Sequence, residues 1–141
     1  MINDVSTDLE DPPLIVLANA PIAFPDGARA ALSRSGKPSP WIAAAAPARV
    51  QEAVLAAIAS RSDWSLGDNG PGHITFLATS KIFQFKDDVT IRLREQGQYT
   101  RVDVRSRSRT GRSDLGANAK RIRALINASA AQLSLIQTSK P

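Results

Sequence analysis

Residues 86–109, KDDVTIRLREQGQYTRVDVRSRSR, decide the fold, because apolar and polar residues alternate along two runs that Gln96-Gly97 separates. Successive side chains of a β-strand point to opposite faces of the sheet, so the alternation places the aliphatic residues of both runs on one face. These residues are Val89, Ile91, Leu93, Val102 and Val104. The segment therefore predicts an antiparallel β-hairpin with one buried face.

The turn fixes the register of this hairpin. With Gln96-Gly97 as a two-residue turn, Glu95 faces Gln98, and the residue numbers of every facing pair add up to 193. The pairs used below are Asp87 with Ser106, Asp88 with Arg105, Ile91 with Val102 and Arg92 with Arg101. A slip by one residue would turn every valine outward, so the hydrophobic pattern supports this assignment of the two faces.

Helices and further strands flank the hairpin. Residues 47–61, PARVQEAVLAAIASR, repeat apolar side chains every four positions behind a proline at the first helical position, which predicts a helix. Residues 73–79 and 82–86 alternate like short strands, and a long helix is expected to begin around Ser113-Asp114. The order predicts an α+β fold in two layers, with about four antiparallel strands, a short helix before the sheet and a long C-terminal helix packed on one face.

Residues 1–46 form an arm of different composition. The arm holds six of the nine prolines, which lack the backbone donor and restrict the preceding residue, so an irregular structure is predicted. Its apolar run Leu14–Leu17 is interpreted as a short strand or as a strip lying on the body. A loop of this length either wraps the domain or links it to another one. We expect a single domain overall, with the arm over 1–46 and the α+β domain over 47–141.

The composition excludes several functional classes. The chain has 141 residues, a formal net charge of +5, no cysteine and one histidine, His73. Disulfides, thiolate metal sites and cysteine nucleophiles are thereby excluded, and neither a metal nor another cofactor is expected. No apolar run reaches the ~18 residues that a membrane span requires. His73 stands at the start of a predicted strand and is interpreted as structural rather than catalytic.

The positive charge is concentrated in one part of the chain. Residues 92–123 carry ten basic and three acidic residues, whereas residues 1–47 carry three basic and five acidic ones. Guanidinium groups beside the free N–H groups of a helix N-terminus attract anions. The predicted anion- or partner-binding residues are Arg105, Arg107, Arg109, Arg112 and Ser113. The alternative is a solvated face that internal ion pairs neutralise.

The inner face of the hairpin changes from aliphatic to polar at one end, where Asp87, Ser106 and Ser108 are predicted to form an inner polar cluster. Asp87 and Asp88 point to opposite faces and therefore cannot act together at one site. We expect Asp87 to be buried and to accept hydrogen bonds from residues 106–114, because buried polar groups are generally paired. The cluster has no histidine or evident lysine to activate a serine, so no catalytic residues are predicted.

Several of these segments match the motifs of a known family. KDDVTIRL at 86–93 and TRVDVRSRSRTGRSDLGANAKRIRAL at 100–125 resemble the signature of the domain-of-unknown-function 1499 family, as do NDVSTDLEDPP at 3–13 and TSKIFQFKDD at 79–88. The resemblance implies relatives in bacteria and plant plastids and supplies no established reaction. Many members carry apolar membrane segments before the first of these motifs. The chain is therefore expected to be either a soluble fragment of a membrane-tethered envelope protein or a short member.

Three functional hypotheses follow. The first is a non-enzymatic binding or accessory module whose basic face takes an anionic ligand or a protein partner. The second is an enzyme acting on an anionic small molecule, with Asp87 as the acid or base. The third is weak binding of nucleic acid without sequence preference, which requires a continuous basic face that is not neutralised.

Overall fold

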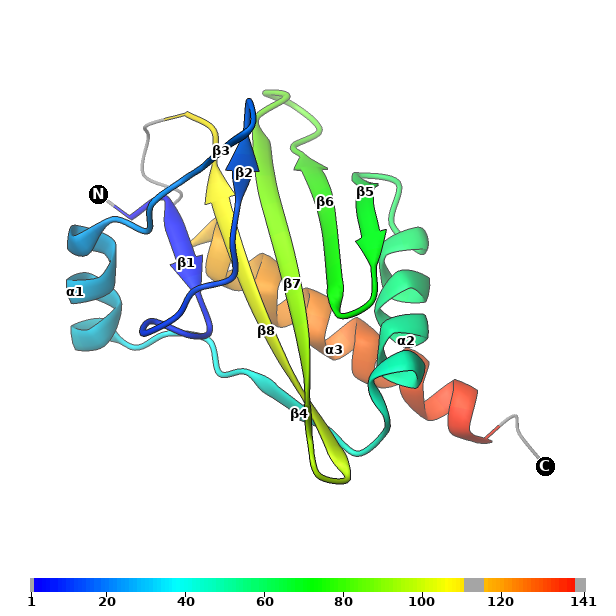
Figure 1. Cartoon of the computed structure of the whole chain (residues 1–141). Helices are drawn as coiled ribbons and strands as arrows, with labels where there is room; N and C mark the ends of the chain where they lie inside the picture. Colours follow the sequence, from blue (N-terminus) through cyan, green and yellow to red (C-terminus); the bar gives the residue numbers. More distant parts are fainter. Residues whose placement is uncertain (1, 111–115, 139–141) are drawn as a thin grey trace.

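The computed structural model describes residues 2–110 and 116–138, which form an α+β fold with a six-stranded antiparallel sheet (Figure 1). The strand order is β1-β8-β7-β6-β5, and β4 pairs with β8 farther along the same edge as β1. The strands of this sheet are β1 (Asp4–Ser6), β4 (Trp41–Ala43), β5 (Trp64–Gly70), β6 (His73–Thr79), β7 (Lys86–Gln96) and β8 (Tyr99–Ser108). The fold class is thus as predicted, but the strand count is six rather than about four.

The helices α2 (Pro47–Ala59) and α3 (Ala117–Thr138) cover one face of the sheet, called here the inner face (Figure 1). Pro47 begins α2, as predicted, since a proline at the first helical position loses no hydrogen bond. The buried side chains of both helices meet those of β6, β7 and β8 in one core. The helical members are Val50, Val54, Ile58, Ile122, Leu125 and Leu133. The predicted start of the long helix, Ser113-Asp114, lies outside the described residues.

The predicted register of the central hairpin is wrong by two residues. Gln96 pairs with Tyr99, so the turn is Gly97-Gln98 and the numbers of facing pairs add up to 195. The physical reason is the φ of +59° at Gly97, since a two-residue turn can require a positive φ at its first central position, where glycine fits. A shift by two keeps every side chain on its predicted face.

The corrected register changes the facing pairs. Arg92 faces Asp103 instead of Arg101, which removes the like-charge pair predicted at that point, although Arg94 now faces Arg101. On the same face Asp88 lies opposite Arg107 rather than Arg105. On the inner face Asp87 lies opposite Ser108 rather than Ser106, and Ile91 lies opposite Val104 rather than Val102.

Residues 82–86, predicted as a strand, belong mostly to the connection between β6 and β7. Gln84 has a φ of +56°, which breaks the extended conformation that the alternation of Phe83 and Phe85 suggested. The side chains of Ile82 and Phe83 are exposed instead of packed on the sheet. The alternation of apolar residues therefore did not indicate burial here.

The N-terminal 46 residues contain more regular structure than predicted. They provide β1, β4, the helix α1 (Asp26–Ser35) and a two-stranded hairpin of β2 (Val16–Leu17) and β3 (Ala20–Pro21). Pro25 precedes α1, and Gly36 with a φ of +96° ends it. Val5, Leu32 and Ala43 from this segment belong to the same core as α2 and α3. The β2–β3 hairpin lies on the face of the sheet opposite the helices, called here the outer face (Figure 1).

Candidate functional site

The acidic N-terminal arm covers the basic outer face of β7 and β8. Asp8 accepts a hydrogen bond from Arg92 at 3.1 Å and lies 3.6 Å from Arg101, while Arg101 donates to the buried Asp103 at 2.7 Å. Asp11 accepts from Arg94 at 3.1 Å. The opposite charges of the two sequence segments thus meet in two separate groups of ion pairs, of which Asp4 with Arg105 is one, and both groups together are called here the arm–sheet network. It consists of Asp4, Asp8, Asp11, Arg92, Arg94, Arg101, Asp103 and Arg105.

The pair of Arg105 with Asp4 is buried. Arg105 donates from Nε and Nη2 to the two carboxylate oxygens of Asp4 at 3.0 and 2.7 Å, and the residues are 2% and 0% exposed. The same guanidinium donates to the carbonyl oxygens of Pro13 and Ile22 at 3.2 and 3.0 Å and lies over the ring of Phe24. Arg105 therefore has neither exposed surface nor a free end of its guanidinium to offer a ligand.

Electrostatics differ between the two arm aspartates. Burial raises the pKa of Asp4 against the opposing effect of Arg105. Burial also opposes the ionisation of Asp8, but hydrogen bonds from the backbone N–H groups of Asp11 and Glu10, together with Arg101 and Arg92, lower its pKa overall. The carboxylate of Asp8 is thus stabilised first by the arm's own backbone and then by two arginines of the sheet.

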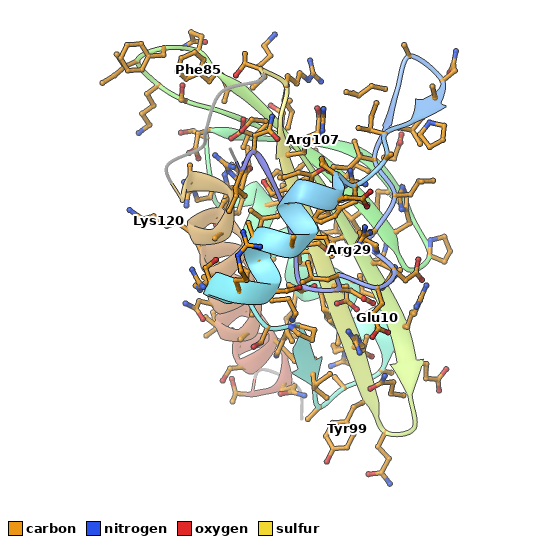
Figure 2. The ribbon with its side chains drawn as sticks, turned by 90° about the vertical axis from the view of Figure 1, so that its left-hand side faces the viewer. Glu10, Arg29, Phe85, Tyr99, Arg107 and Lys120 are labelled. Atoms are coloured by element: carbon orange, nitrogen blue, oxygen red, sulfur yellow. The ribbon has the colours of Figure 1, made fainter. Side chains whose placement is uncertain are left out.

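The other predicted anion-binding residues lie apart from one another. The Nε of Arg107 lies 3.6 Å from Asp4, and no described group forms a hydrogen bond with it. Arg109 donates from Nε and Nη2 to the two carboxylate oxygens of Asp88 at 2.9 and 3.0 Å. Arg112 and Ser113 lie outside the described residues. In Figure 2, Arg107 lies toward the end of the molecule that Phe85 marks, and Tyr99 marks the opposite end.

The inner polar cluster does come together, with two members that the sequence interpretation missed. Ser106 donates to the side-chain oxygen of Asn118 at 2.6 Å, and the amide of Asn118 donates to Ser108 at 3.0 Å. Asp87 is buried, as expected, and forms an ion pair at 2.8 Å with Arg121 of α3, whereas residues 111–114 of the segment predicted to bind it lie outside the described residues. Asn118 and Arg121 stand three positions apart on an otherwise apolar face of the long helix, and this pattern was the signal for them in the sequence.

The outer face of β5 and β6 is left uncovered, and a cavity of about 470 Å³ lies between it and residues 14–17 of the arm. We call this cavity the strap groove. Leu14 and Val16 of the arm, which are about half exposed, and Leu77 on the outer face of β6 contribute apolar surface. The polar lining consists of Ser65, Asp68, His73, Thr75, Asp88, Thr90 and Arg109. Arg109 is thus the predicted anion-binding residue that lines a cavity.

A β-bulge shapes the floor of the strap groove. The pairing of β5 with β6 shifts between Leu66 and Asn69, and the N–H of Asp68 donates to the hydroxyl of Thr75 at 2.8 Å. A Cβ at Gly67 would lie 2.6 Å from that hydroxyl, so the close approach of the two strands requires glycine. The glycines and the proline of residues 67–72 are typical of a turn, and nothing in the sequence locates the bulge.

Within the described residues, no three His, Asp or Glu side chains gather as a metal site, and no helix is long and apolar enough to cross a membrane. The family model for "Protein of unknown function (DUF1499)" matches residues 4–128, so the chain belongs to this family, as its motifs predicted. A crystal structure of TTHA0849 from Thermus thermophilus is similar with a TM-score of 0.41 and 9% identity, over 70% of this chain and 96% of that one. A search among curated proteins gave no match.

Proposed function

We propose that the protein is a non-enzymatic binding module that holds an amphipathic ligand in the strap groove, with an anionic head at Arg109 and an apolar tail along Leu77 and residues 14–17. The observation that carries the proposal is the division of the outer face. The arm covers the arginines of β7 and β8, whereas the apolar surface beside Arg109 stays open.

The chemistry of Arg109 fits the role of an anion ligand. A guanidinium has five N–H donors, and Asp88 takes two of those of Arg109, at Nε and Nη2. Asp88 therefore orients the group without using all of its donors, and a phosphate or carboxylate can bind the remaining ones. Arg105, by contrast, is surrounded by Asp4 and two carbonyl oxygens.

Binding is favoured over catalysis because the groove lacks an oriented base. A catalytic histidine is usually held by a hydrogen bond from its second ring nitrogen, and within the described residues the side chain of His73 forms none. Asp87, the acid or base of the alternative hypothesis, lies on the inner face, is buried and is paired with Arg121. Nucleic acid fits less well, because the arm neutralises much of the basic face.

The test is isothermal titration with octyl phosphate, with inorganic phosphate as the head alone and 1-octanol as the tail alone. We expect octyl phosphate to bind best, and Leu14→Asp to weaken its binding by about tenfold or more, since an apolar contact is lost. Arg109→Ala should weaken octyl phosphate binding and leave octanol binding unchanged.

Two matched controls define the outcome. Leu135→Asp changes a similarly exposed leucine on α3, and Arg61→Ala removes an arginine equally exposed and equally bound to an aspartate, Asp63. Both controls should bind octyl phosphate like the wild type. Equal losses in the controls, or no binding of octyl phosphate by the wild type, would overturn the proposal.

A further inference from the structure

The connection between β6 and β7, residues 80–85, exposes two large apolar side chains. Ile82 and Phe83 are 83% and 72% exposed, the highest values among the large apolar residues described. They belong to none of the cavities described above, and the strap groove does not include them. Exposed apolar side chains that are gathered at one point mark interaction sites more often than scattered ones do.

Hydrogen bonds between its two ends close the backbone of this loop. The N–H of Phe85 donates to the hydroxyl of Ser80, and the N–H of Ser80 donates to the carbonyl of Phe85, both at 2.9 Å. The side chain of Gln84 donates to the carbonyl of Lys81 at 3.0 Å. Gln84 adopts a positive φ, which a residue with a side chain rarely does and which the closed loop maintains. The loop thus holds Ile82 and Phe83 outward.

Positive charge flanks the apolar tip on both sides. Lys81 and Lys86 are exposed, and neither forms an ion pair with a described residue. Asp63, whose carboxylate Lys81 influences electrostatically, is already bound by Arg61 at 2.8 Å. The flanking lysines are therefore available to an external anionic surface.

The shape of this end of the molecule fits a planar surface. The β6–β7 loop and the β2–β3 hairpin lie at the same end in two perpendicular views, opposite the β7–β8 turn (Figures 1 and 2). The tip is convex and small, whereas a stable protein interface buries roughly 800 Å² on each partner. An aliphatic and an aromatic side chain between two lysines match the apolar and anionic layers of a lipid surface.

We propose that residues 80–86 dock the protein onto an anionic lipid bilayer, with Ile82 and Phe83 entering the acyl boundary and Lys81 and Lys86 contacting the headgroups. This inference does not depend on the ligand of the strap groove. Binding is weak and reversible, because two apolar side chains supply less burial than one fatty-acyl chain. It falls as salt rises, since the lysines act through a screened surface potential.

The experiment is co-sedimentation of the full chain with vesicles of phosphatidylcholine alone and of equimolar phosphatidylcholine and phosphatidylglycerol. Sedimentation is expected only with the anionic vesicles. Ile82→Asp/Phe83→Asp should abolish it, and Lys81→Glu/Lys86→Glu should lower it by more than about tenfold. Far-UV circular dichroism checks that the variants stay folded.

The controls separate docking from general stickiness and from the groove. Leu14→Asp and Leu135→Asp, which remove exposed leucines elsewhere, should sediment like the wild type. So should Arg34→Glu/Lys37→Glu, which changes the net charge by the same amount at and after the end of α1. A Phe83→Trp variant should shift its emission to shorter wavelength only with anionic vesicles.

Three results would overturn the inference. They are no sedimentation of the wild type, equal sedimentation of the Ile82→Asp/Phe83→Asp variant, and self-association through the loop in light scattering without vesicles. Loss of sedimentation in the groove variant Leu14→Asp would assign the lipid contact to the strap groove instead.

Discussion

The two halves of the outer sheet face differ in what the N-terminal arm does to them. Over β7 and β8 the arm brings aspartates onto arginines and buries Arg105 against Asp4. Over β5 and β6 the arm leaves a cavity with half-exposed apolar side chains and Arg109 in its lining. The comparison teaches that a basic run in a sequence can serve mainly to hold an acidic segment of the same chain. The surface open to a ligand then lies on neighbouring strands that carry fewer charged residues.

Breaking the buried pair should have the largest effect. Asp4→Ala leaves the guanidinium of Arg105 buried without its counter-charge, which costs about 3–5 kcal/mol of unfolding free energy. Asp88→Ala breaks the more exposed pair with Arg109 on the open half and should cost less than about 1 kcal/mol. Urea denaturation of both variants measures the difference, and equal costs would contradict the distinction between the halves.

The next largest loss of stability is expected in the inner polar cluster, where Asp87 can be compared with its neighbour Asp88. Asp87→Ala removes the ion pair with Arg121 inside the protein and should cost about 1–3 kcal/mol. Asp88→Ala, one residue away on the opposite face, is the matched control. The same urea experiment applies, and an unchanged transition midpoint for Asp87→Ala would count against a structural role for the cluster.

The interpretation of the sequence is right on the faces of the hairpin but wrong on its pairing. The alternation around Val89 and Val102 assigns every side chain to its correct face, because the period of a strand is two. The register depends on whether Gln96-Gly97 or Gly97-Gln98 forms the turn, and the glycine at the first central position of the latter was the signal that the prediction did not use. Arg121, with which Asp87 forms an ion pair, lies 34 positions away in the chain, and local patterns carry no information on such contacts.

The arm shows the same limit on a larger scale. The opposite charges of residues 1–47 and 92–123 were visible in the sequence, but nothing in either segment pairs Asp4 with Arg105 rather than with Arg107 or Arg109. That choice follows from the pairing of β1 with β8, which is set by packing across about a hundred residues. The strap groove exists only because of this pairing and was not predictable.

Acidification should loosen the arm through Asp8. The folded-state pKa of Asp8 is lowered, so its carboxylate contributes stability above the ordinary value of 3.8 and loses it as the pH falls through the folded value. The difference in unfolding free energy between the wild type and Asp8→Asn should therefore be full at neutral pH and shrink below pH 3.8. A difference that stays constant down to the acid transition would contradict this role.

Asp63 is the control for that experiment. The hydrogen bond from Arg61 lowers the pKa of Asp63, so Asp63→Asn should show the same sign of pH dependence. Hydrogen exchange at neutral pH separates the two variants. Amides of residues 8–11 should exchange faster in Asp8→Asn and at the wild-type rate in Asp63→Asn, because only Asp8 belongs to the arm.

The smallest effect is expected at the exposed edge of the arm–sheet network. Arg94 and Asp11 form a pair in which both side chains are more than half exposed, so Arg94→Ala should change stability by less than about 0.5 kcal/mol. Added salt should abolish the difference in stability between Arg94→Ala and the wild type. A loss of unfolding free energy as large as that of Asp4→Ala would mean that the Arg105–Asp4 pair does not contribute most to the stability of the arm–sheet network.

The most direct test of the divided outer face is an amide NMR titration of the wild type with octyl phosphate at low salt. The account predicts the largest shift changes at residues 14–17, 65–68 and 73–77 and at Arg109, which line the strap groove. Residues 101–107 of β8, which the arm covers, should stay nearly unchanged. Changes concentrated at 101–107 would show that the basic strand binds the anion despite the arm, and would contradict the account.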